Sequence, residues 1–196
     1  MHPYRSFIHR YQTVSDVTWR EIEKRLVRKE IKAGDLLLPE GRICRHVWFL
    51  ERGLMRYFIN RDSREITKFF TVAPYCFTSQ RSFNQRLPAT ENIEALQDGI
   101  LWEMTMDSAN CLMTLPGWSL FVRKLTQEVQ FLTEGILEDL QEMTPAERYQ
   151  KMLLNGDPLL QQVSLKHLAS FLGIAPQSLS RIRKRMIANT SEVNLG

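Results

Sequence analysis

The spacing of apolar residues changes from helical to strand-like and back to helical along this chain of 196 residues. Helical spacing after a capping residue, either Ser15 or Asp16, predicts a first helix over 15–29. From residue 30 to about 112 the apolar runs are short and are interrupted by turn residues and glycines, as in an antiparallel barrel or sandwich. The predicted strands are Asp35–Leu38, Val47–Leu50, Leu54–Ile59, Ile66–Phe70, Asn92–Leu96 and Ile100–Met104.

A long apolar stripe follows Pro116 and Gly117. Its residues recur at alternating spacings of four and three: Trp118, Val122, Leu125, Val129, Leu132 and Ile136. This a/d register predicts a helix over 117–142 whose stripe pairs with the same stripe of a second copy. Ordinary packing of an amphipathic helix on one sheet is the alternative. Phe121 and Phe131 lie off the seam, and we expect both to pack on the β-rich region of their own chain.

The chain from 144 onward is basic and helical. Thr144, Pro145 and Glu147 have the order of a capping box with proline at the first helical position, which predicts a helix start and a domain boundary near 143. Residues 144–196 hold 7 basic and 3 acidic side chains, whereas residues 1–143 are balanced. A basic region beside a neutral body indicates a polyanion partner such as nucleic acid. A solvated helix face rich in lysine and arginine is the alternative.

Residues 165–184 match the helix-turn-helix pattern. Ala169 is small where two helices approach closely, Gly173 supplies the turn, and Pro176 opens the second helix. Arginine and glutamine suit base edges in a groove, while serine and lysine suit phosphates, although a helical hairpin that only packs is the alternative. The predicted DNA-binding residues are Ser164, Lys166, Gln177, Ser178, Ser180, Arg181, Arg183, Lys184 and Arg185.

The order of these parts resembles the CRP/FNR family of bacterial transcription regulators, and most closely its short Bacteroidetes-type members. The resemblance rests on Gly34, Gly41 and Gly53–Arg56 in the strand region, on the seam, and on the motif at 168–185. It implies an α+β fold that begins with a double-stranded β-helix, or jelly roll, of the cyclic-nucleotide-binding type. The implied domains are a sensor over 1–116, a dimerisation helix over 117–143, and a winged-helix or helix-turn-helix domain over 144–196.

The same resemblance implies a homodimer that binds a pseudo-palindromic operator in double-stranded DNA. If the protein is an activator, RNA polymerase is a further implied partner. The family's recognition helix often begins with Ser-Arg-Glu, and the matching positions here are Ala175, Pro176 and Gln177. Arg181 matches a later arginine of the family. The operator is therefore expected to differ from the well-known one.

The positions that hold a cyclic nucleotide in this family carry different residues here. A Gly-Glu pair that holds the ribose corresponds to Thr78-Ser79, and an Arg-Ser/Thr-Ala run that holds the phosphate corresponds to Ala89-Thr90-Glu91. An unpaired carboxylate beside a buried phosphate costs several kcal/mol, so we expect cyclic AMP not to bind in the usual mode. The alternatives are a cation from Arg81 or Arg86, another small ligand, or no effector. The implied ligand pocket comprises Thr78, Ser79, Gln80, Arg81, Ala89, Thr90 and Glu91.

Other cofactors and activities have little support in the sequence. The three cysteines, Cys44, Cys76 and Cys111, are far apart and none lies near the start, which argues against disulfides and against an N-terminal iron–sulfur cluster. Only His46 lies in the strand region, so a cupin-type metal enzyme lacks ligands. His46 and the His2-Pro3 start give a haem site little support, because a lone histidine is more often structural or on the surface. We therefore expect no cofactor and no enzymatic activity.

Two further expectations concern the cysteines and the compartment. A redox switch through Cys76 or Cys111 is conceivable, but both lie in apolar or aromatic sequence and are expected to be buried and inert. No stretch approaches the ~20 apolar residues of a membrane span. The first residues have no apolar signal region. These features predict a cytoplasmic protein that does not bind membranes.

Overall fold

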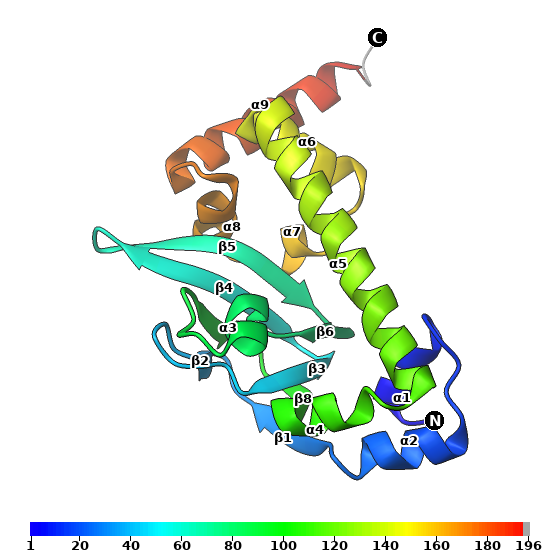
Figure 1. Cartoon of the computed structure of the whole chain (residues 1–196). Coiled ribbons are helices and arrows are strands. Elements are labelled where there is room, and N and C mark those ends of the chain that lie inside the picture. Colours follow the sequence, from blue (N-terminus) through cyan, green and yellow to red (C-terminus); the bar gives the residue numbers. More distant parts are fainter. Residues whose placement is uncertain (194–196) are drawn as a thin grey trace. The chain divides into compact units, whose positions relative to one another are not determined.

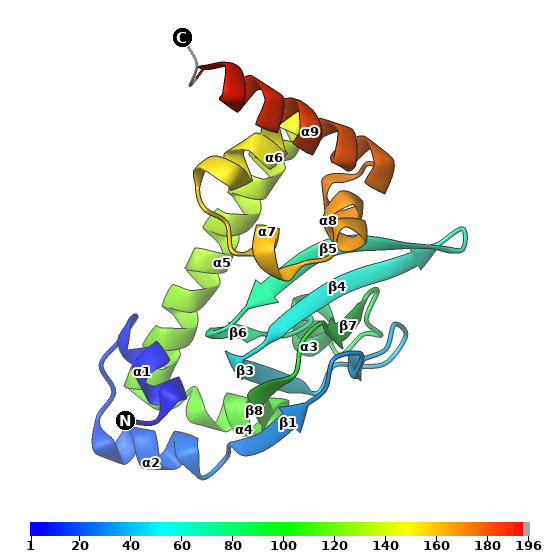
Figure 2. The ribbon, with the colours of Figure 1, turned by 180° about the vertical axis from the view of Figure 1, so that it is seen from behind.

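The computed structural model describes residues 1–193, with side chains up to residue 186. The chain divides into two compact units (Figures 1 and 2). The first comprises Met1–Ile59 and Phe69–Glu134, and the second comprises Asn60–Lys68 and Gly135–Gly196. Each unit has apolar core residues of its own.

Two four-stranded sheets form the body of the first unit. One has the order β1-β8-β3-β6 and the other β2-β7-β4-β5. The first strand thus lies beside the eighth, the second beside the seventh, the third beside the sixth and the fourth beside the fifth, which is the arrangement of a jelly roll. The strands are β1 (Val27–Ile31), β2 (Leu36–Leu38), β3 (His46–Arg52), β4 (Leu54–Arg61), β5 (Arg64–Val72), β6 (Tyr75–Phe77), β7 (Asn92–Ala95) and β8 (Gly99–Thr105).

The central strand β3 is buried on both faces because successive side chains point to opposite sides of a sheet. Trp48 and Leu50 pack with Met55 and Ile93 of the other sheet. Phe49 points the other way, into a second core made with helices. Those helices are α1 (Pro3–His9), α2 (Asp16–Glu23), α4 (Met106–Leu112) and the start of α5 (Pro116–Glu142). A short helix, α3 (Gln80–Gln85), follows β6.

The second unit is mainly helical. Its helices are α6 (Pro145–Leu154), α7 (Leu159–Gln162), α8 (Leu165–Leu172) and α9 (Pro176–Val193). The predicted capping box of α6 is confirmed, because Thr144 Oγ1 accepts from Glu147 N and the Glu147 carboxylate accepts from Thr144 N at 2.7 Å. Between 144 and 193 the structure has helices only, so the wing of the predicted winged helix is not among the described residues.

The six predicted strands are all confirmed, with ends that differ by at most about two residues. The predicted helix over 15–29 is wrong in its second half, because α2 ends at Glu23 and β1 begins at Val27. Lysine, arginine and glutamate favour a helix locally, but here they are the charged side chains of an edge strand paired with β8. Lys29 Nζ lies 2.8 Å from Glu103 Oε1 across this pair.

Two glycines allow the strands to meet closely at one end of the roll. Gly53 has φ +120°, and a Cβ atom on it would lie 3.3 Å from Gly99 Cα. A Cβ atom on Gly99 would lie 2.2 Å from Arg52 O. Backbone atoms therefore occupy the space that a side chain at position 99 would need.

We expect Gly99→Ala to lower the free energy of unfolding by about 1–3 kcal/mol or more, because the clash is with backbone that cannot rotate away. Gly135→Ala is the matched control, since Gly135 lies within α5 and a methyl group added there would have no atom within 4 Å. That variant should gain about 0.5–1 kcal/mol through helix propensity. Urea denaturation measures the free energy of unfolding of both variants. Equal changes in the two variants would contradict the close backbone approach at Gly99.

His2 provides a test of pH dependence. Its Nδ1 accepts from Tyr4 N at 3.1 Å, and its ring centroid lies 4.9 Å from that of Trp19 and 4.3 Å from that of Trp102. Burial is the main cause that lowers the His2 pKa below 6.5. The unfolded chain therefore binds more protons just below that pH, and stability should fall as the pH drops below about 6.5.

His2→Asn keeps a capping acceptor but removes the titrating ring. We expect the free energy of unfolding to fall less in this variant than in the wild type between about pH 7.5 and about pH 5.5. The same loss in both proteins would show that His2 does not supply the pH dependence.

Candidate functional site

The first candidate site is the pair of helices α8 and α9 with the turn between them. Ser164 Oγ caps α8 by accepting from His167 N at 3.3 Å. Gly173 closes the helix with φ +75°, and Ile174 N then donates to Ala169 O at 3.0 Å. Pro176 begins α9, as its position in the motif predicts. The local geometry is therefore fixed by residues that the sequence singles out.

The apolar positions of this motif form a small core. Leu168, Leu172 and Leu179 are buried, and Ala169 is fully buried where the two helices pack. Tyr149 and Met152 of α6 complete this core. Because these contacts fix the orientation of both helices, they determine which polar side chains face solvent.

The side chains predicted to contact DNA lie mostly on the exposed surface. Ser180 is half-buried, and the others are exposed: Ser164, Lys166, Gln177, Ser178, Arg181, Arg183, Lys184 and Arg185. None of the ion pairs between described residues involves the four basic side chains of α9. Their charge is therefore available to a polyanion.

Arg148 is a polar residue that the sequence did not single out. It lies on α6, and its Nη2 donates to Leu172 O at 2.9 Å, at the C-terminal end of α8. A cation that binds the last carbonyls of a helix stabilises that end. Only the three-dimensional packing of α6 on α8 reveals this role.

The predicted seam on α5 falls into two parts. Trp118 is buried, and Val122 and Leu125 pack against the same core of the first unit. Further along, Val129 and Ile136 are half-buried and Leu132 is 48% exposed. Pairing of this seam with a second copy stays a prediction.

Phe131 corrects one expectation about α5. The side chain was expected to pack on the β-rich region, but it is 68% exposed. Phe121, by contrast, is buried as expected. The difference follows from position, because Phe121 faces α1 and β3 whereas Phe131 lies beyond the part of α5 that the core covers.

Polar contacts hold the first half of α5 to its own unit. Glu128 Oε1 accepts from Tyr11 OH and from Tyr75 OH, both at 3.0 Å. Lys124 Nζ donates to Tyr11 O at 2.7 Å. Burial and the Glu128 carboxylate both raise the pKa of Tyr11 and of Tyr75, so these hydroxyls stay protonated and can donate.

The second candidate site comprises the residues at the expected ligand pocket. Ser79 is buried, and its Oγ donates to Glu91 Oε1 at 2.6 Å. Thr90 Oγ1 donates to the other oxygen, Oε2, at 2.9 Å. The structure thus brings together Ser79, Thr90 and Glu91, from both halves of the predicted pocket. Two hydroxyl groups of the chain bind the carboxylate.

Neighbouring positions are also bound within the protein. Thr78 Oγ1 donates to His46 O at 2.9 Å and lies 3.3 Å from Cys44 Sγ. Ala89 is buried, whereas Gln80 and Arg81 are exposed on α3. Among the predicted pocket residues, the one arginine, Arg81, therefore does not place its guanidinium group inside the pocket.

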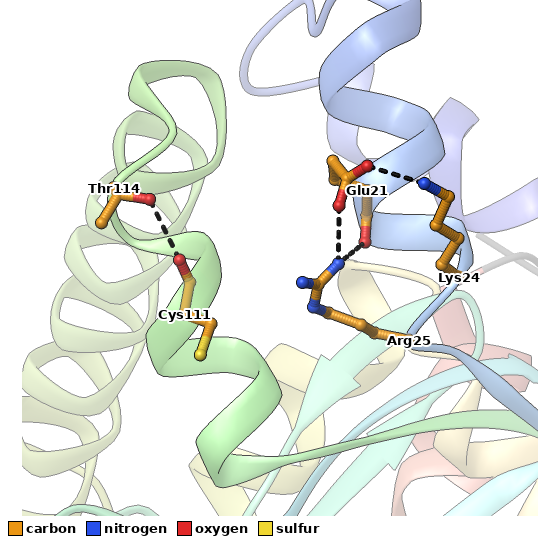
Figure 3. Close-up of polar contacts among 5 residues, drawn as sticks. All are labelled: Glu21, Lys24, Arg25, Cys111 and Thr114. Atoms are coloured by element: carbon orange, nitrogen blue, oxygen red, sulfur yellow. Dashed lines mark hydrogen bonds and ion pairs between the residues drawn. The ribbon is translucent and has the colours of Figure 1, made fainter.

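Burial differs among the three cysteines, of which Figure 3 shows Cys111 with its contact to Thr114. Cys44 and Cys76 are buried, and burial raises the pKa of Cys76 to about 12. Cys111 is exposed, so the expectation that it is buried is wrong. It lies near the end of α4, where the chain turns and Thr114 Oγ1 donates to Cys111 O at 3.1 Å.

Metal-ligating side chains are dispersed over the described part of the chain. Within residues 1–193, no three side chains among histidine, cysteine, aspartate and glutamate gather in a way that could hold a metal ion. No described helix combines the length and apolar composition that a membrane span requires.

Comparison with known proteins identifies the fold. No family model and no curated protein matches the sequence. The c-di-GMP responsive global regulator CLP of Xanthomonas campestris has a TM-score of 0.71 at 13% identity, over 90% of this chain and 93% of that one. A regulator from Eubacterium rectale assigned to the crp/fnr family has a TM-score of 0.70 at 16% identity, over 90% and 85%.

FixK2 of Bradyrhizobium japonicum has a TM-score of 0.69 at 14% identity, over 84% of this chain and 86% of that one. Such low identities show a common fold. The predicted resemblance to CRP/FNR regulators is confirmed at that level.

Proposed function

We propose that this protein is a sequence-specific DNA-binding transcription regulator that acts as a homodimer on a pseudo-palindromic operator. The observation that carries the proposal is the exposed basic surface of α9, set on a packed helix pair with a glycine turn. Helices of this kind place side chains near their N-terminus against base edges in the major groove. The fold common to this chain and several bacterial regulators supports the same function.

The polar side chains of α9 suit two kinds of contact with DNA. Gln177 and Arg181 lie in its first two turns and suit adenine and guanine edges. Arg183, Lys184 and Arg185 add positive charge that suits backbone phosphates. The proposed place of action is the bacterial cytoplasm, where DNA is present. RNA polymerase is a further partner if the protein activates transcription.

The proposed dimer uses the second half of α5. Leu132, Leu137 and Leu140 are each about half exposed, and Phe131 is more exposed still. Large apolar side chains gathered on one exposed helix suit a helix–helix interface. A second copy would bring a second α9, as a two-fold operator requires.

The proposed sensor does not hold a cyclic nucleotide in the family's usual mode. Glu91 belongs to the run that corresponds to the family's phosphate-binding run, and its carboxylate accepts from Ser79 and Thr90. A phosphate there would meet a carboxylate and would have to displace two hydroxyl donors. Regulation by a cyclic nucleotide or another small ligand in a divergent pocket is the second candidate, favoured by the fold common to this chain and CLP, a c-di-GMP responsive regulator.

Arg181→Ala tests the recognition helix. We expect operator affinity to fall by about 1–3 kcal/mol and discrimination at one base position to relax, because an arginine–guanine pair is lost. The operator is first selected from a random duplex library, and binding is then measured by fluorescence anisotropy at several salt concentrations. Arg20→Ala is the control, because Arg20 is an exposed residue of α2, and this variant should bind like the wild type. Unchanged binding by Arg181→Ala would remove Arg181 from the interface.

Leu132→Glu tests the dimer. A buried charge facing its own copy should convert dimers into monomers and weaken operator binding at least about tenfold. Val17→Glu is the control, because Val17 is 69% exposed but lies on α2 and not on the proposed dimer surface of α5. Light scattering after size exclusion gives the mass of each variant. A dimer that survives Leu132→Glu would place the interface elsewhere.

A calorimetric titration with cyclic AMP and cyclic GMP tests the sensor. We expect no heat of binding and no shift in the melting temperature, because the phosphate region holds Glu91. The titration uses protein whose oligomeric state is known at the same concentration. Tight binding would show that the correspondence of Ala89-Thr90-Glu91 with the phosphate-binding run is wrong.

A further inference from the structure

A cavity of about 480 Å³ lies on the first unit, outside both candidate sites. Its polar lining comes from three segments of the chain, which contribute Arg45, His46, Arg86, Thr105 and Asp107. Its size falls within the range of small-molecule sites. Guanidinium groups bind phosphate oxygens well because their planar N–H donors match the geometry of a phosphate group.

Within the described part of the chain, neither arginine has a close ion-pair partner. Arg45 makes no ion pair or side-chain hydrogen bond with another described residue. Arg86 Nη2 lies 3.8 Å from Asp107 Oδ1, and both side chains are mostly exposed. This long, solvated pair contributes little and can rearrange.

The backbone holds the two arginines in place. Ser82 Oγ accepts from Cys44 N at 2.8 Å and donates to Leu87 O at 2.6 Å, so one buried hydroxyl joins the segments next to Arg45 and Arg86. Arg86 itself has φ +56°, a conformation that non-glycine residues adopt at some cost. A strained residue that carries a cation into a cavity suits a binding role.

A second cavity, of about 420 Å³, is also lined by His46. Lys29, Trp48 and Glu103 are among its other lining residues. His46 thus lines both cavities, and the second also has polar groups and the Trp48 ring, which suit the organic part of a ligand. We propose that Arg45 and Arg86 bind the phosphate group of a small phosphate monoester.

Calorimetry of the full chain tests this proposal with two probes, inorganic phosphate and phenyl phosphate, at constant ionic strength set with chloride. We expect both to bind and the ester to bind more tightly, because its ring can enter the second cavity. Phosphate binding without any gain for the ester would overturn the monoester assignment. Absence of heat with both probes would overturn the site.

Variants separate binding from folding. Arg45→Gln and Arg86→Gly should each weaken phenyl phosphate binding at least about tenfold. Arg86→Gly should also raise the melting temperature, since glycine adopts a positive φ freely. Asp107→Asn should tighten binding, because it removes the carboxylate beside Arg86. Arg20→Gln is the control and should bind like the wild type.

The outcomes are distinguishable from those of the DNA-binding proposal. The cavity does not include α9, so these variants should leave operator affinity in phosphate-free buffer unchanged. If Arg45→Gln and Arg86→Gly weakened DNA binding while neither probe bound, the arginines would belong to a nucleic-acid interface and the proposal would fail.

Discussion

The burial of β3 on both faces is the constraint on which the rest of the first unit depends. Trp48 and Leu50 join the two sheets, and Phe49 joins the same strand to the helices. Because one strand serves two cores, the jelly roll and the helical cover cannot form independently. The burial of Phe49 therefore stabilises the packing of α1 and α5 on the sheet. The half-exposed apolar residues of α5 begin only where this cover ends.

Much of the fold could be predicted because its signals are local. Six of the seven strands from β2 to β8, and the cap of α6, follow from short apolar runs, glycines and capping residues. β1 was missed because Arg28, Lys29 and Glu30 carry a helical propensity that only pairing with β8 overrides. β6 and α3 were missed because each is too short to show a period.

The candidate sites were predictable to different degrees. The exposed face of α9 follows from helical spacing alone, so the residue types that face solvent could be stated in advance. The contact of Ser79 with Glu91 joins residues 12 apart, and it could not be foreseen from local pattern. The cavity lined by Arg45 and Arg86 depends on two features that have no sequence signal. These are the hydrogen bonds of Ser82 and the left-handed backbone conformation of Arg86.

The contact between Gly53 and Gly99 has a consequence for how such a chain can evolve. A Cβ atom at position 99 would lie 2.2 Å from Arg52 O and 3.2 Å from Gly53 Cα, and a Cβ atom at position 53 would lie 3.3 Å from Gly99 Cα. A substitution at position 53 or 99 would shift the loop that carries the other. Accepted substitutions at the two positions are therefore coupled, although the positions are far apart in the chain. A lineage that replaced either glycine would have to rebuild both loops together.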